Sequence, residues 1–219
     1  MQGLTHTTEY DFFIKSNCPY PYSNITWIGP ILLKTALPEI NFNSFQCLDC
    51  SSLNVHEYFT HAGDSILVVN RTILDSLISI SYDLSKICVS HISNFDSLML
   101  GISFNDSIST WDVSNAISMS SMFQDASLFN QYIGNWDVGN VTNMSSMFEG
   151  ATSYSQSMYN WNASSAGNMS SMFKNASSFN GDTRNWNVQN VTDISSMFEG
   201  ASSFNQELRN WNTSNVTDM

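Results

Sequence analysis

Apolar and polar residues follow one fixed pattern through the second half of the chain. Tryptophan recurs there every 25 residues, and the other apolar positions recur with it. A unit of 25 residues is too short to bury its own apolar side chains, so neighbouring units must cover one another. The sequence therefore predicts a tandem stack in which residues 25 apart lie side by side. The five tryptophans are Trp111, Trp136, Trp161, Trp186 and Trp211.

Each unit contains one segment with helical spacing and one segment rich in β-forming residues. Met144, Met147, Phe148 and Ala151 fall at i, i+3, i+4 and i+7, which is one face of a helix of about two turns. Gly150 stands where such a helix should end, although Asp and Asn hold this position in two other units. The eight residues before Met144 predict a short strand that pairs in parallel with its neighbours. We therefore expect an α/β solenoid with short parallel strands, short helices and 25 residues per coil.

The apolar residues that recur at this interval predict the core of the solenoid. Columns of methionine and aromatic side chains form a core more often than they line a ligand site. Stacked coils would bring each tryptophan over the next, about 4.8 Å away. The columns begin at Met119, Met122, Phe123, Ala126 and Phe129.

Three regions differ in how closely they follow the repeat. Residues 1–62 hold all four prolines and predict an irregular N-terminal segment. Residues 63–110 predict a degenerate cap and first coil, because terminal repeats must close the core on one side. Helical spacing from Ile73 to Ile78 predicts a helix that covers this coil. Residues 111–219 are the regular repeats.

The regular array stops inside a unit, at Met219, without a polar cap. An uncapped end offers apolar side chains and unpaired backbone groups to another chain. The sequence therefore predicts either a fragment of a longer array or end-to-end self-association through the C-terminal coil.

Net charge and hydropathy limit the classes of partner that the sequence allows. The chain is acidic, with a net charge of -12, which disfavours nucleic acid and anionic lipid. Its apolar stretch from Ile28 to Leu37 is interrupted by Pro30 and Lys34 and is shorter than the roughly 20 residues of a membrane span. We therefore predict no nucleic-acid partner and no membrane-spanning segment in this chain. Residues 1–25 also lack a signal peptide, so either the chain is cytosolic or its export signal lies outside this sequence.

The four cysteines, Cys18, Cys47, Cys50 and Cys88, all precede the regular repeats. They allow three disulfide pairings, among which the sequence does not choose. The spacing of Cys47 and Cys50 also fits half a zinc site or a redox dithiol, but no second pair at matching spacing accompanies it. A disulfide that braces the N-terminal region is the better interpretation in an oxidising compartment.

No motif in the chain predicts catalysis. His56 and His61 are five residues apart, whereas the zinc-protease helix needs histidines at i and i+4. Nucleophile elbows, phosphate loops and recurring acid–base groups are also lacking from the sequence. We therefore expect a non-enzymatic protein without metal or cofactor.

The repeat unit resembles that of BspA-like leucine-rich-repeat surface proteins. The residues that carry the resemblance run from Trp136 to Phe148 and from Glu199 to Gln206, and the likeness extends over about residues 92–219. The resemblance implies a leucine-rich-repeat-like solenoid in an extracellular or cell-surface setting. It also implies an adhesion or protein-protein interaction role without known chemistry.

The first functional hypothesis is therefore a surface-displayed interaction or adhesion module that binds a protein or glycan on another surface. The alternative is a structural spacer or self-assembly element without a specific ligand. Side chains that break the repetition separate the two hypotheses, because recognition needs a local departure from it. The candidate binding face consists of Tyr132, Tyr159, Arg184 and Arg209, which lie in the variable segment before each tryptophan.

Overall fold

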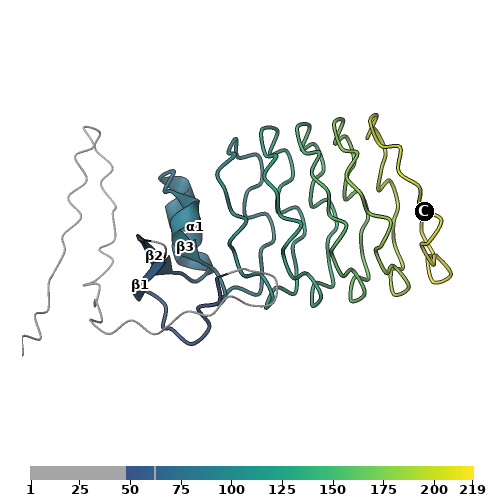
Figure 1. Cartoon of the computed structure of the whole chain (residues 1–219). Coiled ribbons are helices and arrows are strands. Elements are labelled where there is room, and N and C mark those ends of the chain that lie inside the picture. The colour runs from purple at the N-terminus through teal and green to yellow at the C-terminus, as the bar shows by residue number, and fades with distance from the viewer. Residues whose placement is uncertain (1–47, 62) are drawn as a thin grey trace, which may run out of the picture.

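The described part of the chain is a row of stacked turns with a small sheet and one helix at its N-terminal end (Figure 1). The computed structural model describes residues 48–61 and 63–219. The predicted irregular segment therefore lies largely outside the described residues, as do Cys18 and Cys47.

The sheet has three strands in the order β1, β2, β3. Strand β1 (Tyr58–His61) pairs antiparallel with β2 (Asp64–Val68), and β2 pairs in parallel with β3 (Ile87–Cys88). The chain crosses from β2 to β3 through helix α1 (Arg71–Ser79) and the 3-10 helix η1 (Leu84–Lys86). The boundary that the sequence predicts at residue 62 falls between β1 and β2.

Helix α1 contains the predicted helical segment. The Asn70 side chain accepts a hydrogen bond from the backbone N–H of Ile73 at 3.0 Å, so it caps the N-terminus of the helix. Ile73 and Leu74 are buried in the same apolar cluster as the side chains inside the stacked turns. The core thus continues from the helix into the stack.

A disulfide between Cys50 and Cys88 joins the segment before β1 to strand β3, with Cα atoms 6.3 Å apart. Both cysteines lie in a second, smaller core with Phe59 and Val68. The backbone N–H of Leu48 also donates to the carbonyl of Thr110 at 2.8 Å. Because Cys50 is bonded to Cys88, it does not serve as half of a zinc site with Cys47.

The helices predicted in the repeats are wrong: the described residues 111–219 contain turns and no helix. The N–H groups of Met147, Glu149 and Ala151 donate to carbonyls three residues earlier. The N–H groups that alternate with them, those of Ser146, Phe148 and Gly150, donate to the next turn of the stack. An α-helix would need all of these donors for bonds within one segment. The predicted strands are likewise reduced to single parallel bridges, one between each pair of neighbouring turns.

Two columns of residues with positive φ allow this backbone. One column is serine in every turn, with φ between 53° and 55°: Ser121, Ser146, Ser171 and Ser196. The other, with φ between 57° and 72°, is Asp125, Gly150, Asn175 and Gly200. Glycine, asparagine and aspartate adopt this left-handed conformation more readily than other residues. The sequence predicted an imperfect helix end at Gly150 and its equivalents. This position is instead a turn position with positive φ, which Asp, Gly and Asn can all occupy.

The tryptophan column is buried up to Trp186 and partly buried at Trp211, and it is hydrogen-bonded from turn to turn. Trp111 and Trp136 stack with ring centroids 6.3 Å apart and an interplanar angle of 1°. Each indole N–H donates to a backbone carbonyl of the preceding turn, as Trp161 does to Ile133 at 2.9 Å. The methionine, phenylalanine and alanine columns are buried beside it, as expected from the sequence, except in the last turn, where Phe198 and Phe204 are partly buried and Met219 is exposed. Residues 25 apart thus supply apolar contacts between turns, and residues 24 to 28 apart supply the hydrogen bonds.

Arg71 closes the N-terminal end of the stack. Its guanidinium donates to the carbonyls of Asn94 and Asp96 at 3.1 and 3.0 Å. In the next turn, the equivalent carbonyls of Ser118 and Ser120 accept backbone N–H groups of the first turn. The arginine therefore donates the two hydrogen bonds that backbone N–H groups of a preceding turn would otherwise donate.

We expect Arg71→Met to lower the free energy of unfolding by about 1–2 kcal/mol, because two carbonyls lose a charged donor. Chemical denaturation of the full chain measures this change. Lys174→Met is the matched control, since it removes a lysine that pairs with Glu199 at 3.0 Å on the surface of the stack. Exposed pairs of this kind contribute about 1 kcal/mol or less. Equal losses in the two variants would contradict the capping role of Arg71.

Candidate interaction surface

Three of the four candidate residues occupy one position of the repeat. Tyr159, Arg184 and Arg209 each stand two residues before a tryptophan, so they lie side by side in successive turns. In the preceding turn this position is Gly134, and Tyr132 lies two residues before it. The sequence alone leaves open whether Tyr132 joins the line.

The structure brings Tyr132 into this line. A Cβ atom on Gly134 would lie 2.7 Å from the Tyr132 ring and hydroxyl, so the tyrosine covers the glycine. Burial raises the pKa of Tyr154 well above its ordinary value, and the neighbouring Tyr132 hydroxyl raises it further. Tyr132 therefore lies over Gly134, at the repeat position that Tyr159 occupies in the next turn. We call Tyr132, Tyr159, Arg184 and Arg209 the tyrosine–arginine stripe.

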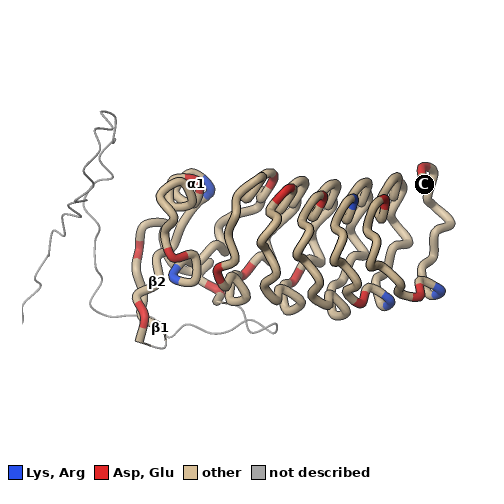
Figure 2. Tube along the Cα trace, turned by 90° about the horizontal axis from the view of Figure 1, so that it is seen from above, with Lys and Arg blue, Asp and Glu red and all other residues tan. Residues whose placement is uncertain are grey.

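Each arginine of the stripe pairs with an acidic residue two positions earlier. Arg184 donates through Nε and Nη2 to the two carboxylate oxygens of Asp182 at 3.0 and 2.7 Å. In the next turn, Arg209 donates through Nη2 to one carboxylate oxygen of Glu207. Figure 2 shows pairs of opposite charge along one edge of the last turns. The two acids are functional candidates that the sequence reasoning missed, although acid and arginine recur at a spacing of two in both units.

These pairs fix the electrostatics of the stripe. The hydrogen bond from Arg184 holds the pKa of Asp182 below its ordinary value, and the same bond raises the pKa of Arg184. Both groups are therefore charged at neutral pH, and their charges cancel. Tyr159 and Glu207 also lie near enough to Arg184 to raise its pKa slightly further. The stripe is thus polar without a net charge.

The stripe is accessible and its backbone is held in place. Tyr132 and Tyr159 are 47% and 43% exposed, and the Arg184 side chain is 50% exposed. The residues between them in sequence, such as Ile133 and Met158, are fully buried and anchor the same loops. Exposed contact groups on anchored loops can meet a partner with little ordering cost.

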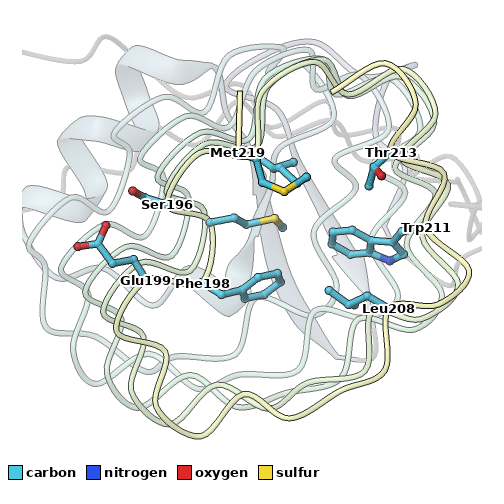
Figure 3. A pocket seen from close by; sticks show the side chains of 9 residues that line it. Ser196, Phe198, Glu199, Leu208, Trp211, Thr213 and Met219 are labelled. Atoms are coloured by element: carbon cyan, nitrogen blue, oxygen red, sulfur yellow. The ribbon is translucent and has the colours of Figure 1, made fainter. Parts of the chain in front are cut away.

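A second feature is the apolar cavity of about 480 Å³ at the C-terminal end of the stack. Figure 3 shows Phe198, Leu208, Trp211 and Met219 pointing into its centre. Ser196 and Glu199 lie at its rim. This cavity lies on the last turn, and one of its lining residues, Leu208, stands between Glu207 and Arg209 in the sequence.

Two kinds of feature are absent from the residues that the structure describes. Among them, no three His, Cys, Asp or Glu side chains gather in a way that would hold a metal ion. No helix between residues 48 and 219, residue 62 apart, has the length and apolar character to cross a membrane.

A comparison with protein families matches residues 71–183 and 130–219 to the family described as Mycoplasma protein of unknown function, DUF285. Searches of curated proteins and of solved structures returned no match. The two matched segments overlap and together span residues 71–219, which is more than half of the 219-residue chain. The chain therefore belongs to this repeat-containing family, and the match covers the 25-residue turns and helix α1.

Proposed function

We propose that the chain is a non-enzymatic, surface-displayed module for interaction or adhesion, and that it binds its partner through the tyrosine–arginine stripe. The observation that carries this proposal is the exposed line of Tyr132, Tyr159, Arg184 and Arg209, one residue per turn, on a surface rich in Ser, Thr and Asn. The partner is a protein or glycan on another surface. The resemblance of the repeat to BspA-like leucine-rich-repeat surface proteins supports the same role and the solenoid class.

The composition of the stripe supports recognition. Tyrosine and arginine are enriched at protein interfaces and dominate their binding energy, whereas serine is depleted there. The stripe contains four such side chains, one for each of four successive turns. Contacts spaced along a rigid stack favour multivalent binding.

The disulfide supports a location outside the cytoplasm. Disulfides form and persist in oxidising compartments and are rare in cytosolic proteins. The bond between Cys50 and Cys88 is buried in its own small core, as expected of a structural disulfide. An exported, surface-displayed chain is consistent with this bond.

We expect Tyr132→Ser/Tyr159→Ser to reduce the attachment of protein-coated beads to cell monolayers at least about tenfold, because the variant removes both aromatic anchors. Bead retention under flow measures the effect. Ile117→Thr/Leu128→Ser is the matched control, since these side chains are 55% and 57% exposed outside the stripe. Thermal unfolding should be similar for both variants. Equal retention of the two variants would refute the proposed binding role of the stripe.

The second candidate is a structural element that self-associates through the apolar cavity. In the described chain, the backbone N–H groups of Ser196, Phe198 and Gly200 lack the acceptors that equivalent groups find in the next turn. A second copy that covers the cavity would bury Trp211 and Met219. Light scattering should then show an oligomer that Phe198→Asp converts to a monomer. A wild-type protein that stays monomeric at high concentration would contradict this candidate.

A further inference from the structure

We infer that the tyrosine–arginine stripe binds an uncharged oligosaccharide that runs along the stack with its sugar rings against Tyr132 and Tyr159. This inference rests on the proposed function, because it assigns a partner class to the same surface. It follows from the spacing of the stripe, the chemistry of its side chains and the hydrogen bonds that its backbone N–H groups already make.

The spacing suits a linear chain of sugar rings. Equivalent rings in neighbouring turns are 5.2 Å apart for Phe123 and Phe148 and 6.1 Å apart for Tyr154 and Phe179. These core rings give the spacing of neighbouring turns, and the stripe contributes one side chain from each turn. A linear oligosaccharide presents its rings at a comparable interval, so one ring can meet each turn.

The two tyrosines offer the aromatic half of a sugar site. Each has an apolar ring and a polar hydroxyl, so it can cover the C–H face of a sugar and bond to its rim. Both side chains are nearly half exposed and lie in adjacent turns. Tyr132 is supported from below by Gly134, which has no side chain to lift the ring.

The acid–arginine pairs offer the hydrogen-bonding groups that a sugar site also needs. A guanidinium carries five N–H donors, and the bonds to Asp182 use those on Nε and Nη2. Remaining donors and nearby carboxylate lone pairs suit sugar hydroxyls, which both donate and accept. The exposed residues that follow the stripe, Asn160, Asn185 and Asn210, add further amide donors and acceptors.

The charge of the site favours an uncharged ligand. Asp182 and Glu207 already neutralise the two arginines. A sulfated or sialylated glycan would have to displace these carboxylates and approach a chain of net charge -12. An uncharged glycan meets neither obstacle.

The backbone of the stripe disfavours a peptide added as an extra strand. Strand addition needs free backbone N–H and C=O groups at an edge. The N–H of Arg184 already donates to Asp182 at 3.0 Å, and that of Tyr159 donates to the Ser157 hydroxyl at 3.4 Å. Recognition at the stripe therefore depends on side chains, which suits a glycan better than an extended peptide.

The test applies the full chain to an array of neutral oligosaccharides of two to about eight sugars, together with sialylated and sulfated ones. We expect binding to a subset of the neutral glycans, with signal rising beyond two sugars, and at least about a tenfold loss in Tyr132→Ser/Tyr159→Ser. Ile117→Thr/Leu128→Ser should bind as the wild type does. Added salt should change the signal little, because no net charge is neutralised.

Three outcomes would overturn the inference: no neutral glycan binds, charged glycans bind better, or the stripe variant binds as well as the control. Bead attachment to monolayers whose surface glycans have been removed by glycosidases separates this inference from the proposed function. Attachment that still depends on the stripe after that treatment would leave the proposed function standing and refute the glycan. Attachment that never depends on the stripe would refute both.

Discussion

Replacing Trp161 with alanine is expected to lower the free energy of unfolding by about 3–5 kcal/mol. The indole is only 2% exposed and stacks on Trp186 with ring centroids 5.9 Å apart. Its N–H also bonds to the carbonyl of Ile133, which belongs to the preceding turn. The substitution therefore opens a cavity and leaves a buried acceptor without its donor. Because each turn is stabilised by its neighbours, the loss should affect the whole stack.

Chemical denaturation followed by circular dichroism measures this loss. Trp161→Phe should cost less, since it keeps an aromatic ring in the column and removes only the hydrogen bond and part of the volume. Trp211→Ala is the matched control, because Trp211 has the same position in the repeat but is only partly buried. A loss for Trp161→Ala no larger than that for Trp211→Ala would show that the tryptophan column does not hold the stack together.

Removing the disulfide with Cys50→Ala/Cys88→Ala is expected to cost about 2–5 kcal/mol. The bond joins residues 38 apart in sequence and fastens the segment before β1 to β3. Without it, the unfolded chain gains freedom and the small core around Phe59 and Val68 loses its covalent link. The midpoint of thermal unfolding should fall accordingly.

Reduction provides the complementary measurement. A reducing agent should destabilise the wild type and leave the double variant nearly unchanged, because the variant has no bond at this place to lose. Cys18→Ala/Cys47→Ala controls for the two cysteines outside the described residues. If that control, rather than the first variant, loses the response to reductant, the stabilising bond is not the one between Cys50 and Cys88.

The 25-residue period was enough to identify which residues meet. It placed Trp136 over Trp111 and predicted buried columns of methionine, phenylalanine and alanine. These relations depend only on spacing and hydrophobicity, which one sequence displays directly. The helix over Ile73 to Ile78 was also predictable, because its apolar face and the preceding Asn70 are local signals.

The backbone inside each turn was not predictable from that pattern. Apolar residues at i, i+3, i+4 and i+7 fit a helix, but they fit consecutive turns with i to i+3 hydrogen bonds as well. The deciding signal was the column of Asp125, Gly150, Asn175 and Gly200, whose members share only a tolerance for positive φ. Hydrogen bonding to neighbouring turns then favours turns over a helix, and such contacts are invisible in a single unit.

The candidate surface was predictable in part. Departures from the repeat pointed to Tyr159, Arg184 and Arg209, and equal spacing placed them in line. The place of Tyr132 depends on how its ring folds over Gly134, which spacing does not reveal. The choice of Cys50 and Cys88 among three pairings likewise depends on tertiary contacts.

The hydrogen bonds between turns repeat at fixed positions: N–H groups such as that of Met144 donate to the C-terminal neighbour, those such as that of Thr142 donate to the N-terminal one, and Arg71 ends the series. Each interior turn is therefore interchangeable with any other. Molecules that differ by a whole number of turns would fold alike. A single inserted residue would instead shift the register between backbone donors and acceptors of neighbouring turns. Recombination between the repeated stretches of the coding DNA could thus lengthen or shorten this protein without a new folding problem.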